Sequence, residues 1–105
     1  MTQRVFFGDV KPYAVPDSLE ELRGPYEGAV DLPMWVYWAP GSRSFRVDDP
    51  DQAEMAYIAV LSEGILTDVC ELVNAQRLRS LWGRMVLPRR ARAEWEQRFP
   101  ELAEA

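Results

Sequence analysis

Apolar side chains recur every three or four residues from Asp49 onward, which is the spacing of one face of an α-helix. The clearest stretch is 50–63. Asp49 is a favourable N-cap, Pro50 suits the first helical position, and Gly64 is a typical helix end. The positions expected to face the core are Ala56, Tyr57, Val60 and Leu61. This width of apolar face predicts a central helix.

Three shorter helices are predicted after Gly64. Thr67 is expected to cap the first helix and Asn74 the second. Pro88 is expected to open the last helix and Pro100 to close it. The apolar stripes of the three helices are Val69, Leu72 and Val73; Leu78, Leu81, Trp82 and Met85; and Leu87, Ala91, Trp95 and Phe99.

The chain before Asp48 has a different pattern, because five prolines fall before residue 41 and exclude long helices there. The segment 1–17, with "RVFFGDV", is expected to form an N-terminal arm or an edge strand. "DSLEEL" predicts one helical turn capped by Asp17 or Ser18. The aromatic stretch "GAVDLPMWVYWAPG" and the following "SFRV" predict a hairpin-like pair of strands around 34–47.

Together these elements predict an α+β fold, with a short N-terminal β-hairpin or small antiparallel sheet followed by a compact bundle of about four short helices. Residues 1–105 are expected to form a single domain, since this length supports one modest core. Within it, 18–48 form the β and aromatic part and 49–99 the helical part.

The run "MWVYW" would place side chains alternately on the two sides of a strand. Met34, Val36 and Trp38 would share one side. Trp35 and Tyr37 would share the other. The aromatic side chains either fill the core or form an interface, and both interpretations are kept here. The residues expected to contact a partner are Trp35, Tyr37 and Trp38.

Charge is distributed unevenly along a chain whose net charge is −5. Residues 1–75 carry five basic and thirteen acidic side chains, whereas residues 76–98 carry seven arginines and two glutamates. Two electrostatically different surfaces are therefore expected. The acidic run Asp48, Asp49, Asp51 and Glu54 could suggest a divalent metal, but capping of the helix at 50–63 explains these residues without one.

The sequence contains no recognisable catalytic motif. The chain has no histidine and no Gly-rich phosphate loop, so no cofactor or catalytic residue is expected. Cys70, the single cysteine, is interpreted as a buried structural thiol. The single cysteine also favours a reducing cytoplasm, and no signal peptide or membrane-spanning stretch is recognised.

The basic segment has three interpretations. The two helices on either side of Asn74 could form a helix-turn-helix, which would direct polar residues toward DNA. A solvated helix face is the simpler alternative. Arg89 and Arg90 fall in the first turn of a helix, where the positive helix end repels them, which points to an external anion or an acidic partner. The candidate nucleic-acid or anion contacts are Gln76, Arg77, Arg79, Arg84, Arg89 and Arg90.

Residues 18–102 resemble a group of small, uncharacterised actinobacterial proteins of similar length. The resemblance lies in the Asp49-Pro50 helix start with Tyr57 and Glu63-Gly64, and in Leu81-Trp82 followed by Leu87-Pro88 and Trp95. Some members are encoded beside nucleotidyltransferase-type toxins of the abortive-infection class. The resemblance implies an antitoxin-like partner of such a toxin and carries no catalytic motif.

The sequence thus predicts a cytoplasmic, non-enzymatic interaction protein that binds a protein partner, such as a toxin encoded next to it. The alternative is a helix-turn-helix-like DNA-binding transcriptional regulator acting on operator DNA. The two are compatible, since antitoxins often repress their own operons. Neither a membrane nor a metal is an expected partner. A homodimer is possible, and the sequence leaves the oligomeric state open.

Overall fold

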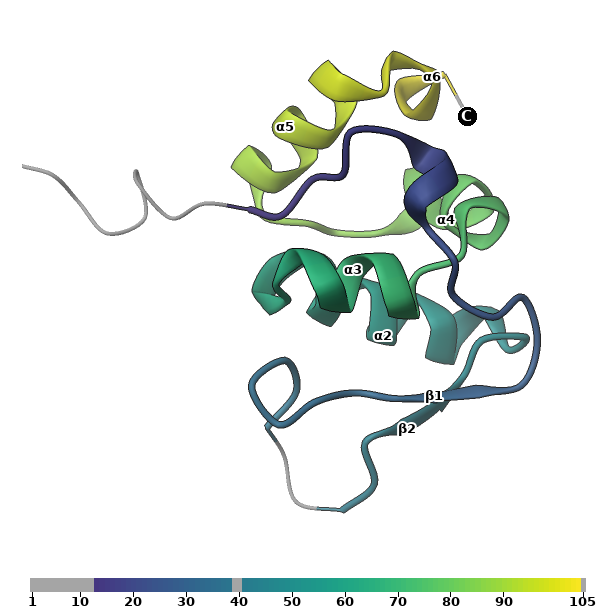
Figure 1. The fold of residues 1–105 in the computed structure, drawn as a ribbon. Coiled ribbons are helices and arrows are strands. Elements are labelled where there is room, and N and C mark those ends of the chain that lie inside the picture. Colours follow the sequence, from purple (N-terminus) through teal and green to yellow (C-terminus); the bar gives the residue numbers. More distant parts are fainter. Residues whose placement is uncertain (1–12, 39–40, 105) are drawn as a thin grey trace, which may run out of the picture.

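The computed structural model describes residues 13–38 and 41–104, and Figure 1 shows their arrangement. The first part contains the 3₁₀ turn η1 (Leu19–Glu21) and the strands β1 (Ala29–Asp31) and β2 (Ser44–Arg46). The helices that follow are α2 (Pro50–Glu63), α3 (Leu66–Leu72), α4 (Ala75–Leu81), the 3₁₀ turn η2 (Trp82–Arg84), α5 (Arg89–Arg98) and α6 (Pro100–Ala103). This is the predicted α+β fold. The strand or arm expected in "RVFFGDV" lies outside the described residues.

The two strands form an antiparallel hairpin whose central pair is Val30 and Phe45. Both side chains are buried, while their neighbours along each strand are exposed. The hairpin packs against α2, as Figure 1 shows. A small sheet with one apolar face is stable only when a helix covers that face, and α2 does so here.

The expected strand at 34–38 is wrong. Residues 34–36 form a turn in which the Pro33 carbonyl accepts from the backbone N–H groups of Val36 and Tyr37, at 2.9 and 3.1 Å. The hairpin therefore pairs residues 29–31, not 34–38, with 44–46. Alternating side chains alone did not make a strand, because these residues have no partner strand to pair with.

Most of the predicted helix starts are confirmed. The Ser18 side chain accepts from Glu20 N in a capping box with Glu21, and Asp49 accepts from Asp51 N. Asn74 accepts from Arg77 N at 3.0 Å. Thr67 as a cap is wrong, because the N-cap of α3 is Ile65, two residues earlier, and Ile65 N donates to the Asp68 carboxylate at 3.1 Å.

Two prolines lie at helix boundaries in the C-terminal part. One has the predicted role, and the other has an additional one. Pro88 precedes α5 directly, which confirms the predicted start. Pro100 follows the end of α5 and is also the first residue of α6. Proline is tolerated there because the first N–H groups of a helix have no partner within the helix.

The core lies on both sides of α2. The predicted inward positions of this helix are confirmed, since Ala56, Tyr57, Val60 and Leu61 are at most 1% exposed. Trp82, Trp95 and Phe99 belong to the same core and meet through tilted ring contacts. The segment 13–18 passes beside α5, where Arg98 bonds Asp17 at 3.0 Å (Figure 1). No helix in the described part is long and apolar enough to cross a membrane.

Candidate interaction surface

Three large apolar side chains of one turn point into solvent. Met34 is 54% exposed, Trp35 65% and Trp38 80%. Tyr37 is half-buried, and its ring meets Phe45 edge-on with the centroids 5.2 Å apart. The expected alternation is therefore wrong, because Val36 and Tyr37 point inward while the residues on either side of them point outward. Of the three predicted contact residues, Trp35 and Trp38 are exposed and Tyr37 belongs mainly to the core.

The turn is attached to the start of α3 by one hydrogen bond. The indole Nε1 of Trp35 donates to the Asp68 carboxylate at 2.8 Å. The same carboxylate oxygen accepts from Ile65 N at 3.1 Å, and Asp68 is only 7% exposed. The edge of the indole is thus fixed while much of its surface stays open. In Figure 1 the turn lies near the first turn of α3.

This hydrogen bond brings two further exposed apolar residues, Ile65 and Leu66, close to Trp35. Ile65 is 58% exposed and Leu66 is 47% exposed. Neither residue was predicted to bind a partner, although two large apolar residues directly after the Gly64 helix end could have indicated an exposed apolar pair. We call Met34, Trp35, Trp38, Ile65 and Leu66 the aromatic surface. Exposed apolar residues gathered in this way are typical of binding sites.

The predicted basic residues do not form one surface. Arg84 binds the carboxylates of Asp51 and Glu54, each at 2.9 Å, and these partners raise the pKa of Arg84. Arg90 pairs with Glu94 at 3.2 Å. In Figure 1 the start of α5 and the helix α4 lie on opposite sides of the molecule. Arg89 and Arg90 are therefore separate from the residues of α4, and Arg84 is occupied by the carboxylates of α2.

Gln76, Arg77 and Arg79 do share α4, but the start of this helix is covered on one side. The backbone of Gly24 donates to the Val73 carbonyl at 2.9 Å, and Asn74 Nδ2 donates to the Gly24 carbonyl at 3.1 Å. Arg77 Nε donates to the Tyr26 carbonyl at 2.8 Å. A recognition helix contacts bases with its N-terminal residues. Here the segment 23–26 lies along that end of α4.

The acidic run is used inside the fold. Asp49 caps α2, and Asp51 and Glu54 bind Arg84. Asp48 accepts from the Arg46 guanidinium at 2.9 Å, and this hydrogen bond lowers the pKa of the carboxyl. The predicted capping role of the run is confirmed for Asp49. Among residues 13–38 and 41–104, no cluster of three or more cysteine or acidic side chains is placed to hold a metal ion.

Cys70 is buried, as the sequence predicted. Burial raises the pKa of its thiol, and the nearby carboxylate of Glu21 acts in the same direction. A thiol with a raised pKa is protonated at neutral pH and is a poor nucleophile. This residue therefore has a packing role in α3.

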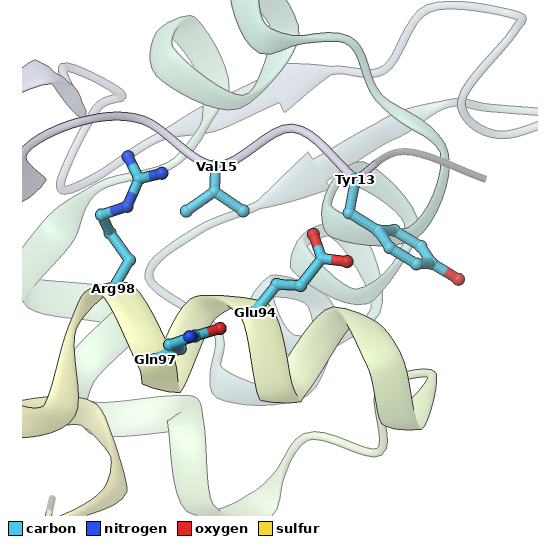
Figure 2. Close-up of a pocket in the computed structure, with 5 residues that line it drawn as sticks. All are labelled: Tyr13, Val15, Glu94, Gln97 and Arg98. Atoms are coloured by element: carbon cyan, nitrogen blue, oxygen red, sulfur yellow. The ribbon is translucent and has the colours of Figure 1, made fainter. Parts of the chain in front are cut away.

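One hollow lies beside α5 and has a volume of about 670 Å³. Figure 2 shows its lining residues, Tyr13, Val15, Glu94, Gln97 and Arg98. Its charged groups are already paired within the fold, since Glu94 binds Arg90 and Arg98 binds Asp17. The hollow thus offers a ligand no unneutralised charge.

The site must be interpreted from its own chemistry. No family model matches this chain, and no curated protein or solved structure matches it.

Proposed function

We propose that this protein is a non-enzymatic interaction module that binds a protein partner through the aromatic surface. The observation that carries the proposal is the exposure of Trp35 and Trp38, 65% and 80%, in a turn fixed to α3 by the bond to Asp68. The more specific proposal follows from the sequence resemblance. It makes the protein the antitoxin-like partner of a nucleotidyltransferase-type toxin.

The physical case rests on anchor residues and preorganisation. Tryptophan is over-represented among the residues that dominate binding energy, and a buried aromatic side chain removes roughly 150–250 Å² from water. Because Asp68 already holds the Trp35 indole, little conformational entropy is lost there on binding. Trp35 and Trp38 are therefore proposed as the two anchors.

The negative charge of residues 1–75 favours a partner with a basic surface. The part of the chain that contains the aromatic surface, residues 1–75, has thirteen acidic and five basic side chains. An excess of acidic side chains speeds encounter with a basic partner surface and disfavours acidic partners. A toxin that handles nucleotides is expected to be basic around its active site, which fits this proposal.

Trp38→Ala is expected to weaken the complex with the product of the neighbouring gene by about thirtyfold, since removing a tryptophan anchor costs about 2 kcal/mol. The free energy of unfolding should hardly change, because the side chain is 80% exposed. Titration calorimetry on the co-expressed, purified partner measures the affinity. Val86→Ala is the matched control, because Val86 is 82% exposed but lies outside the aromatic surface. This variant should bind the partner with the same affinity as the unsubstituted protein. Unchanged affinity of Trp38→Ala, or absence of any complex, would refute the proposal.

The alternative is a helix-turn-helix-like regulator that binds DNA through Gln76, Arg77 and Arg79. The exposed, shared face of these residues on α4 favours it, whereas the segment 23–26 beside the start of α4 does not. If it holds, affinity for promoter DNA should fall steeply as salt increases, because several phosphates release counterions. Fluorescence anisotropy at stepped salt concentrations measures this slope. No binding at low salt would exclude the alternative.

A further inference from the structure

One arginine of the basic segment is held differently from its neighbours. Arg77 lies with its guanidinium carbon 3.8 Å from the centre of the Tyr26 ring, and its Nε donates to the Tyr26 carbonyl at 2.8 Å. Its backbone N–H is fixed by Asn74 at 3.0 Å. Stacking and the backbone bond orient the guanidinium before any ligand arrives.

Arg77 also lacks an acidic partner among the described residues. The other arginines of 76–98 mostly have one. Those with a carboxylate partner are Arg79, Arg84, Arg90, Arg92 and Arg98. Of the three guanidinium nitrogens of Arg77, only Nε makes a hydrogen bond within residues 13–38 and 41–104, so the two terminal amino groups keep their donors. A fixed guanidinium with free donors is suited to bidentate binding of an anion.

The surroundings of Arg77 form a hollow of about 430 Å³, a size typical of small-molecule sites. Its lining residues are Tyr26, Gln76, Arg77, Arg79 and Ser80. Ser80 lies four positions after Gln76, so the two stack on one face of α4, with the arginines on either side. Two cations thus flank a row of neutral polar groups.

Arg79 can take part in binding because its own ion pair is loose. Its Nη2 lies 3.8 Å from the Glu101 carboxylate, which is longer than a hydrogen bond, and both side chains are 54% exposed. Gln76 is exposed and adds an amide donor. Two guanidinium groups supply more donors and charge than one carboxylate requires, and they match the oxygens of a phosphoryl group.

A second hollow of about 290 Å³ adjoins the first and shares Gln76 and Arg79 with it. Leu19, Leu22 and Ala75 contribute apolar walls there. A ligand larger than inorganic phosphate could therefore place its phosphoryl group near Arg77 and its apolar part against these residues.

We propose that the hollow between Tyr26 and α4 is a binding site for a phosphoryl group, carried by a phosphomonoester or by a single nucleic-acid strand. Arg77 is the fixed bidentate donor, Tyr26 supports it from one face, and Arg79 and Gln76 complete the contacts. This site is independent of the aromatic surface, and it does not require α4 to enter a DNA groove, since phosphate contacts carry no sequence information.

The test is a titration of the ¹⁵N-labelled full chain, followed by NMR at constant ionic strength. Inorganic phosphate is the first probe, sodium acetate the carboxylate comparison, and a short single-stranded oligothymidylate the nucleic-acid arm. Phosphate should shift the amide signals of residues 26 and 76–80 and saturate, and acetate should bind at least about tenfold more weakly. Tighter binding of the oligonucleotide than of phosphate would identify a strand as the source; the reverse would identify a phosphomonoester.

Matched arginine variants make the assignment specific. Arg77→Ala should lower the affinity for phosphate by about tenfold or more, and Arg77→Lys should restore only part of it, because an ammonium lacks the planar fork. Arg89→Ala removes the same charge from an exposed arginine at the other side of the molecule and should change the affinity less than about twofold. Arg79→Ala is a second variant for the same measurement of phosphate affinity. The Arg79 side chain is 54% exposed and does not support the core. The proposal would be overturned if Arg77→Ala and Arg89→Ala lost equal affinity for phosphate. It would also be overturned if phosphate shifted the amide signals of all arginines alike.

Discussion

Gly24→Ala should lower the free energy of unfolding by about 3 kcal/mol, which is large for one added methyl group. A Cβ at this position would lie 2.5 Å from the backbone C and O of Leu72 and 2.6 Å from the backbone C of Val73. Backbone atoms cannot rotate away as a side chain can, so the segment 23–26 must move. Its bonds to Val73 and Asn74 would then lengthen or break. For a chain of this size the melting temperature should fall by roughly 12 °C or more.

Urea denaturation followed by circular dichroism measures this change. Gly83→Ala is the matched control, because a Cβ at Gly83 meets nothing within 4 Å. That variant should be neutral or slightly stabilising, since alanine restricts the unfolded chain. If Gly24→Ala were as stable as Gly83→Ala, the close packing of the segment 23–26 against the junction of α3 and α4 would be wrong.

The same substitution links the fold to the proposed phosphoryl site. Tyr26 follows Gly24 by two residues and carries the carbonyl and ring that orient Arg77. Displacing the segment should weaken phosphate binding even at temperatures where the protein stays folded. The aromatic surface lies elsewhere, so binding of the protein partner should be affected much less by this variant.

Trp95→Ala should cost about 4 kcal/mol, the largest loss among the substitutions considered. Trp95 is fully buried and contacts Trp82 and Phe99, with ring centroids 6.1 and 5.7 Å away. Removing the indole leaves a cavity between α5 and η2 that these rings cannot fill. The expected result is a protein close to its unfolding threshold at room temperature, since a domain of this length has about 5–15 kcal/mol in total.

Trp95→Phe is the informative comparison. The indole Nε1 of Trp95 is buried and has no hydrogen-bond partner among the described residues. An unpaired buried donor costs roughly 1–3 kcal/mol, so phenylalanine loses volume but also removes this penalty. Its loss of stability should be less than half that of Trp95→Ala, measured by urea denaturation. A larger loss would mean that the indole N–H is satisfied in solution.

Local signals predicted the helical part well. The N-caps at Asp49 and Asn74 and the helix start after Pro88 depend on hydrogen bonds and backbone limits within a few residues. The failed cap at Thr67 has a local cause too. The carboxylate of Asp68 accepts from Ile65 N, and Ile65, two residues before Thr67, is the N-cap.

The aromatic part was harder to predict, because the run "MWVYW" is compatible with either a strand or a turn. A strand requires a neighbouring strand to satisfy its backbone groups. The Pro33 carbonyl instead accepts from Val36 and Tyr37 and closes a turn. The turn reversed the expected sides, so that Val36 and Tyr37 pack inward. The sequence identified an aromatic cluster but could not tell which of its rings reach solvent.

The sequence by itself determined the α+β class, the central helix and most helix boundaries, because periodicity, capping and proline act over three to four residues. Only the tertiary structure decided which side chains are available for binding. The bond from Trp35 to Asp68 spans 33 positions, and the bond from Arg77 to Tyr26 spans 51. Carboxylates from α2 occupy Arg84, whereas no described carboxylate occupies Arg77. Such long-range pairings depend on how the elements pack. They distinguish exposed aromatic residues and Arg77 from residues of the same type that already have partners within the fold.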